Sequence, residues 1–140
     1  MDAKAIDRAL VSIIEKKAQL SGLFWDDKRY DEVEDDLRKL EDELVDSYGD
    51  DLTEILEAVY DGMDVVGDVQ LPTLYLAKTY SRSGQTADGM GVYDVRPGEG
   101  FRIETDRHAG KFPRLVLIPN PLRVVLQVDG GGREVVWQAK

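Results

Sequence analysis

The chain has 140 residues and a formal net charge of −10, from 18 basic and 28 acidic side chains, and 42% of its residues are hydrophobic. This length suits one domain, 1–140, large enough to bury roughly two-thirds of its unfolded surface without disulfides. The apolar content excludes a wholly disordered or low-complexity chain. There is no cysteine and one histidine, which excludes disulfide frameworks, thiolate zinc sites, cysteine nucleophiles and sites that need two histidines.

The charge is divided unevenly along the chain. Residues 1–68 carry 21 acidic and 8 basic side chains, a net of −13, whereas residues 69–140 carry 7 acidic and 10 basic ones, a net of +3. Such an asymmetry points to a basic partner for the acidic half. The alternative is that the acidic half only keeps a small protein in solution. Adaptation to high salt would acidify the whole surface, so the mildly basic second half argues against it.

The acidic half has the period of helices. Residues 2–20 place apolar side chains three and four positions apart, which predicts a first helix. A second helix is expected to begin at Asp31, with Glu34 three residues on as in a capping box. A third, shorter helix is expected to begin at Asp51 and to end near Gly62.

From about residue 73 the apolar period changes to two, which is typical of strands with one buried face. Short loops join these segments, so neighbours are expected to pair antiparallel. We therefore predict an α+β fold, with two to three N-terminal helices packed on a C-terminal antiparallel β-meander of five to six strands. The connection 81–90 is expected to be a mobile or functional loop. The candidate strands are 73–80, 91–96, 101–106, 114–119, 122–129 and 134–138.

Two apolar segments stand out from this pattern. The run 23–25, Leu-Phe-Trp, is expected to pack the connection between the first two helices onto the core. Residues 115–118 are apolar at every position, so that strand should be covered on both faces. The helices would cover one face, and either sheet curvature or a second subunit would cover the other. The second possibility makes the chain a homodimer.

The templates for catalysis and metal binding fail one by one. His108 could act as a general base oriented by Asp106, but its neighbours include no nucleophile, and an exposed turn residue explains it as well. No serine lies in a Gly-x-Ser-x-Gly motif. An EF-hand register starting at Asp46 places Asp51 where the loop needs glycine. We expect no catalytic residue, no metal site and no cofactor.

Composition and charge also bear on other partners and on location. Arginines and aromatic residues alternate in the second half, as on single-strand-binding sheets, but the net charge of −10 opposes binding to nucleic acid. Charges recur every few residues at the N-terminus, and no window approaches the roughly 20 apolar residues that span a bilayer. We expect no membrane segment, no secretory signal and a cytoplasmic location.

Two functional hypotheses remain. The first is a small, acidic, intracellular and non-catalytic protein-interaction module, which binds a basic protein through its helices or forms a homodimer. Its expected interaction face is Glu41, Asp42 and Asp46. The second is a small-molecule-binding or enzymatic domain with a pocket between the helices and a curved sheet. The expected lining of that pocket is Tyr75, Tyr93, Asp94, His108 and Trp137.

Overall fold

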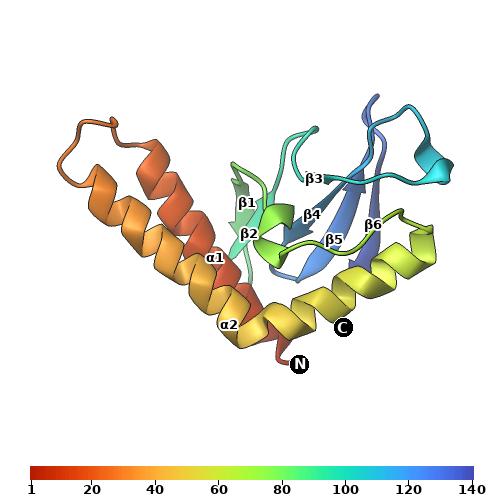
Figure 1. Ribbon diagram of the computed structural model, residues 1–140. Coiled ribbons are helices and arrows are strands. Elements are labelled where there is room, and N and C mark those ends of the chain that lie inside the picture. Colours follow the sequence, from red (N-terminus) through yellow and green to blue (C-terminus); the bar gives the residue numbers. More distant parts are fainter.

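Two helices followed by two antiparallel sheets form the fold in the computed structural model, which describes residues 1–140. The helices are α1 (Ala3–Ser21) and α2 (Tyr30–Met63). In Figure 1 they pair as a hairpin, and the second part of α2 continues along the sheet. The predicted α+β class, with helices before antiparallel strands, is confirmed.

α1 forms where the sequence predicts it. Asp2 caps its first turn, because the Oδ1 atom accepts a hydrogen bond of 3.0 Å from the Ala5 N–H. Ile6, Leu10 and Ile13 form an apolar stripe that is at most 1% exposed. The stripe joins the core between the helices and the larger sheet, so the packing fixes the position of α1.

α2 is one helix of 34 residues, whereas the sequence pattern predicts two. Asp31 and Asp51 do not cap helices: the N-cap position belongs to Arg29, and Asp51 lies in the helix interior. The apolar stripe continues past Asp51 without a break, and a carboxylate that suits a cap also suits an exposed helical face. Gly49, near the midpoint, is buried, and Figure 1 shows the helix turning sharply near its middle.

The strands form two sheets instead of one. Four of them pair antiparallel in chain order as a meander, and the other two form a separate hairpin, so the expectation of five to six strands in one meander is corrected to four. The meander contains β3 (Phe101–Arg102), β4 (Arg114–Ile118), β5 (Arg123–Gln127) and β6 (Arg133–Gln138). The hairpin contains β1 (Ser81–Gln85) and β2 (Gly91–Asp94).

Three expected segments differ from the structure. The expected strand 73–80 does not form: a short 3₁₀ helix, η1 (Pro72–Tyr75), occupies its start, and residues 76–80 are irregular. η1 begins with a proline, which suits a first helical turn. The expected loop 81–90 contains β1, whose five residues are all exposed and therefore show no apolar alternation. The expected strand 101–106 pairs only over β3 before the chain enters the 3₁₀ helix η2 (Asp106–His108).

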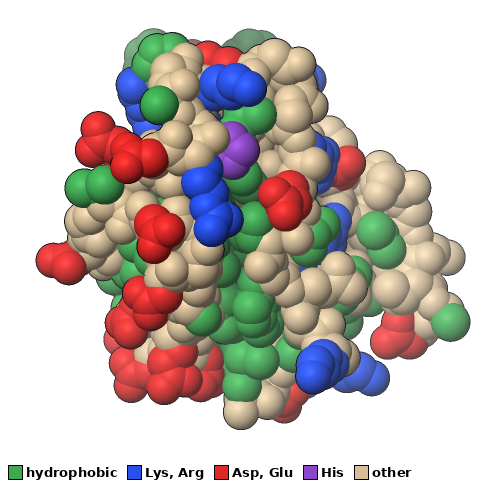
Figure 2. Space-filling model, turned by 90° about the vertical axis from the view of Figure 1, so that its right-hand side faces the viewer, with side chains coloured by type: hydrophobic (Ala, Val, Ile, Leu, Met, Phe, Trp, Pro, Cys, Tyr) green, Lys and Arg blue, Asp and Glu red, His purple; other side chains and the backbone are tan.

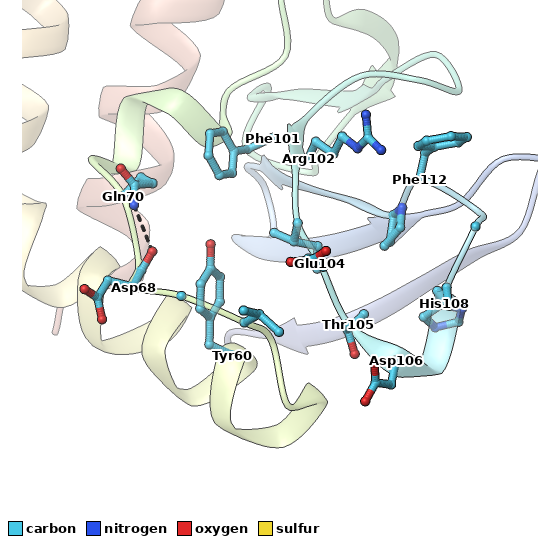
Figure 3. A pocket seen from close by; sticks show the side chains of 16 residues that line it. Tyr60, Asp68, Gln70, Phe101, Arg102, Glu104, Thr105, Asp106, His108 and Phe112 are labelled. Carbon is cyan, nitrogen blue, oxygen red and sulfur yellow. Dashed lines mark hydrogen bonds between the residues drawn. The ribbon is translucent and has the colours of Figure 1, made fainter.

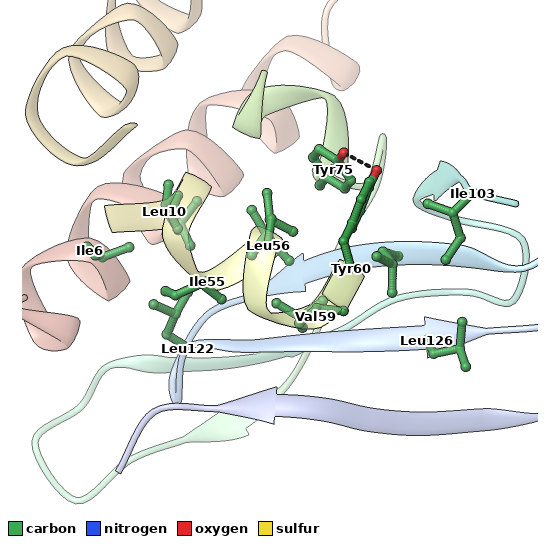
Figure 4. Close-up of a cluster of buried hydrophobic side chains, with 14 of the residues drawn as sticks. Ile6, Leu10, Ile55, Leu56, Val59, Tyr60, Tyr75, Ile103, Leu122 and Leu126 are labelled. Carbon is green, nitrogen blue, oxygen red and sulfur yellow. Dashed lines mark hydrogen bonds between the residues drawn. The ribbon is translucent and has the colours of Figure 1, made fainter. Parts of the chain in front are cut away.

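Alternate residues of β4 enter two separate apolar cores. Leu115 and Leu117 belong to the larger core, which lies between the helices and the sheet (Figure 4). Val116 and Ile118 belong to a smaller core on the opposite face, with side chains from α1 and β2. All four residues are 0% exposed. The strand that is apolar on both faces is therefore covered by the chain itself, and its second face gives no reason to expect a second subunit.

A buried polar cluster ties the N-terminal helix to the sheet. The Asp7 carboxylate accepts a hydrogen bond of 2.9 Å from the Asn120 N–H, in the turn between β4 and β5. Arg123 donates to the carbonyl oxygens of Pro119, at 3.2 Å, and Tyr93, at 3.0 Å. Burial raises the pKa of Asp7, although the Asn120 N–H and the Arg123 charge oppose that shift.

Neither helix of the structure has the length and apolar character that crossing a membrane requires.

Candidate functional site

A helical arm is the most distinctive external feature of the molecule. We define the arm as residues 15–43, the end of α1, the connection and the first half of α2. Only Val33 is buried in this range. In Figure 1 the arm points away from the sheets. Elements that contribute so little to the core are free to present their side chains to a partner.

Two large aromatic side chains occupy the tip of the arm. Phe24 is 81% exposed and Trp25 is 83% exposed, so the prediction that residues 23–25 pack onto the core is wrong for both aromatic residues. The connection is a series of tight turns, with the Asp27 N–H bonded to the Phe24 carbonyl at 2.9 Å. No core lies beneath this end of the hairpin. Adjacent exposed aromatic residues on a projecting element are typical of binding sites.

The arm carries a strong negative charge. Its residues, 15–43, contain eleven acidic and six basic side chains. Near the tip some of them pair: Arg38 approaches Glu34 and Asp35 at 3.7 Å, and Lys16 approaches Asp36 at 3.7 Å.

The carboxylates further along α2 have no such partners. Asp42 and Asp46 are exposed and Glu41 is half-buried, all on α2. The sequence contains no lysine or arginine from residue 40 to residue 77, and none of the eleven carboxylates in that stretch forms an ion pair. The expected interaction face, Glu41, Asp42 and Asp46, lies at the start of this stretch. None of its three carboxylates forms an ion pair.

A groove of about 700 Å³ opens beside the end of α2. In Figure 3 Tyr60, Asp68 and Gln70 line one side, and His108 and Phe112 line the other. The segment after α2 is held to the sheet there by a hydrogen bond of 2.8 Å from the Val66 N–H to the Glu104 carbonyl. The groove is broad and open to solvent.

Three of the polar residues that line the groove, Tyr60, Gln70 and Thr105, form hydrogen bonds within the fold. The hydroxyls of Tyr60 and Tyr75 are 2.6 Å apart, and the Gln70 N–H donates to Tyr75 at 3.0 Å. Burial and this hydroxyl pair raise the pKa of Tyr60 further above physiological pH. The Thr105 hydroxyl donates to the Met63 carbonyl at 2.7 Å.

The exposed groups of the groove do not form a catalytic constellation. The Arg102 guanidinium lies 4.2 Å from the centre of the Phe112 ring. The His108 imidazole forms no hydrogen bond with a hydroxyl or carboxylate, so it has neither a nucleophile to activate nor a group that orients it. Such a groove can bind a ligand, and it contains no base paired with a nucleophile.

The five residues expected to line a pocket are dispersed. His108 is the one that lies in the groove. Tyr75 is 0% exposed in the larger core, whereas Tyr93 belongs to the smaller core on the other face of the sheet. Asp94 forms an ion pair with Arg133, and Trp137 packs against the larger core from β6.

Sequence reasoning missed other residues of the groove. Tyr60 and Glu104 enter it from a helix and from the segment after β3, and no spacing in the sequence relates those two elements. The one signal for this groove in the sequence was that Asp106 lies two positions before His108.

Groups of three or more histidine or carboxylate side chains close enough to hold a metal ion do not occur in the structure. Comparison with known proteins found no matching family model, and neither a curated protein nor a solved structure matches the chain.

Proposed function

We propose that the protein is a non-catalytic interaction module that binds a basic protein partner through its helical arm. The observation that carries this proposal is the pair Phe24 and Trp25, 81% and 83% exposed at the tip of an acidic arm. An isolated exposed apolar residue is ordinary, but two adjacent large aromatic residues at a projecting end are not.

The aromatic pair supplies the contact energy in this proposal. Tryptophan is among the residues most enriched in interface hot spots, where a few anchors in apolar pockets contribute most of the affinity. Leu23 is half-buried beside them and anchors the connection to the helices. The partner is therefore expected to offer an apolar pocket to the tip.

The carboxylates supply attraction at longer range. Glu41, Asp42 and Asp46 belong to a stretch of the sequence without basic residues, and none of them forms an ion pair. A field of one sign accelerates association with an oppositely charged protein, and salt weakens the effect. The partner is therefore expected to surround its apolar pocket with lysine or arginine.

The test is affinity capture from a lysate of the native host, followed by reconstitution with the purified partner. The baits are the unaltered chain, the tip variant Phe24→Ala/Trp25→Ala, and the charge variant Glu41→Lys/Asp42→Lys/Asp46→Lys. We expect a basic protein that binds the unaltered chain and binds both variants at least about tenfold more weakly.

Matched controls separate the arm from general surface effects. Leu71→Ala/Leu74→Ala removes two apolar side chains that are about half exposed elsewhere, at 53% and 50%. Asp68→Lys/Asp88→Lys/Glu104→Lys makes the same change in net charge at exposed positions outside the arm. Both controls should keep full affinity. A partner that binds the tip variant as tightly as the unaltered chain contradicts the proposal.

A second candidate function is the binding of a small ligand in the groove. The observation that favours it is the volume of about 700 Å³, which is in the range of ligand sites. Native mass spectrometry of the protein purified from its own host tests this candidate. An added mass that disappears in a Tyr60→Phe/His108→Ala variant supports it, and a bare chain opposes it.

A further inference from the structure

β6 forms an open edge of the four-stranded sheet. β5 pairs with it on one side, and no strand pairs with its other side. Arg133, Glu134 and Val135 are exposed, the last at 50%. A strand of six residues with a free row of backbone N–H and C=O groups is long enough to template another strand.

An apolar trough runs beside this edge. We define the trough by four residues: Leu126 of β5, Val128 just after β5, and Val136 and Trp137 of β6. Leu126 belongs to the larger core, and the other three pack against it. A bulge in β6 opposite Val124 and Val125 places both Val136 and Trp137 on the side of α2. Figure 2 shows apolar side chains as a continuous band down the middle of this face.

Carboxylates border the trough on the other side. α2 contacts β6, and its exposed acidic residues Glu54, Glu57 and Asp61 form what we call the ridge. Figure 2 shows acidic side chains along the left of the apolar band. The ridge lies in the stretch that contains no lysine or arginine.

We propose that β6 accepts an extended segment of a partner protein as an additional strand. Strand addition satisfies the free backbone groups of an edge, while pockets for alternate side chains give specificity. Alternate residues of the added strand would lie over the trough, next to the ridge. The segment is therefore expected to carry basic residues, with apolar ones between them, on the face that meets α2.

The charges favour a basic segment over a second copy of this chain. Antiparallel pairing of two β6 edges would relate the copies by an axis perpendicular to the sheet, so both α2 ridges would lie on the same face. Two clusters of unpaired carboxylates would then face each other across the junction, which is unfavourable. A lysine- or arginine-containing strand neutralises the same ridge.

The test uses the Phe24→Ala/Trp25→Ala chain, so that the tip of the arm cannot contribute. Short random peptides displayed on phage are selected against this protein, and the best one is synthesised. We expect alternating sequences rich in lysine or arginine, with amide chemical-shift changes centred on β6 when the peptide is titrated. Glu57→Lys/Asp61→Lys should weaken binding at least about tenfold, and Asp68→Lys/Asp88→Lys should not.

A chemical control identifies the binding mode. Methylating the backbone nitrogens on the edge of the peptide that pairs with β6 should abolish binding, and methylating the opposite edge should preserve it. The proposal is overturned if no peptide is selected, if shifts centre away from β6, or if both methylated peptides bind equally. It is also overturned if the free protein sediments as a dimer with protected β6 amides. None of these results bears on the arm, because the arm's tip is absent from the test.

Discussion

The side chain of Asp7 in α1 is bonded to the backbone N–H of Asn120, 113 positions later in the chain, at 2.9 Å. This contact joins the base of the helical arm to the turn between β4 and β5. The carboxylate is buried, and burial raises its pKa despite the Asn120 N–H and the Arg123 charge. The contribution of this contact to the free energy of unfolding should therefore depend measurably on pH.

The first prediction concerns that dependence. The folded state holds the Asp7 proton more tightly than the unfolded state does. The protonated Asp7 carboxyl therefore contributes to the free energy of unfolding at acid pH. This contribution is lost as pH rises from about 4, the ordinary aspartate pKa, through the raised value. Asp7→Asn keeps an acceptor and cannot ionise, so the free energy of unfolding of this variant relative to the unaltered chain should increase between pH 3.4 and pH 7.

Urea unfolding at the two pH values measures this difference. Asp7→Ala serves as the comparison, because it leaves the Asn120 N–H without an acceptor and should lose about 1–3 kcal/mol. A difference between Asp7→Asn and the unaltered chain that stays constant with pH contradicts the assignment.

Sequence patterns predicted the elements whose apolar residues are periodic. In α1 the spacing of Ile6, Leu10 and Ile13 marks the buried face. In β5 the apolar alternation predicted the strand, although four consecutive residues of it are buried and not one face alone. The division of α2 into two helices was wrong, because Asp51 has the residue type of a cap but lies on a continuous helix. β1 was missed because all five of its residues are exposed.

The candidate sites were harder to predict, for related reasons. The sequence shows that Phe24 and Trp25 are apolar, but their exposure depends on the absence of any core beneath the tip. Tyr60 and His108 meet at one groove only because the end of α2 packs against the segment after β3. Contacts of this kind depend on tertiary packing, which leaves no local pattern in the sequence.

The second prediction concerns the tyrosine pair. Tyr75 accepts from the Gln70 N–H and shares a hydrogen bond with Tyr60, whereas Tyr60 takes part only in the shared bond. Tyr75→Phe should therefore lower the free energy of unfolding by about 1–3 kcal/mol, and Tyr60→Phe by about 0.5–1.5 kcal/mol. Chemical denaturation of the two variants checks the order, and a larger loss for Tyr60→Phe is the contrary result.

The third prediction compares two glycines in one turn region. Gly98 and Gly100 both have a positive φ, at 90° and 114°, but a Cβ at Gly98 would meet open space. A Cβ at Gly100 would lie 2.7 Å from the Leu115 carbonyl oxygen, a backbone atom of β4. Gly98→Ala should cost about 1–2 kcal/mol from strain alone, and Gly100→Ala clearly more. Equal losses in thermal unfolding would show that the β3–β4 contact is looser than described.

The fourth prediction separates binding from stability at the arm. Phe24→Ala/Trp25→Ala should change the free energy of unfolding by no more than about 0.5 kcal/mol, because neither side chain contributes to the core. Leu44→Ala, at a residue 1% exposed, should lose about 2–5 kcal/mol. A strongly destabilised tip variant would mean that the aromatic residues are packed in solution.

The fifth prediction tests the uncompensated charge of α2. Glu57 lies three residues after Glu54 and four before Asp61. The substitution Glu57→Gln therefore removes the repulsion between Glu57 and each of these two carboxylates. We expect a gain of about 0.4–1 kcal/mol at low salt, which disappears near 1 M salt. Glu34→Gln is the matched control: Glu34 is paired with Arg38, so its loss should give no gain. Equal effects of the two substitutions would argue against repulsion along α2.

The central claim is that the tip of the arm and the carboxylates of Glu41, Asp42 and Asp46 together bind a basic partner. The most direct measurement is the dissociation constant of the purified partner at low and high salt, for the unaltered chain and for the tip and charge variants. We predict at least about tenfold weaker binding by the tip variant at both salt concentrations. For the charge variant we predict a smaller salt dependence than that of the unaltered chain. Equal dissociation constants for the unaltered chain and the tip variant would contradict the claim.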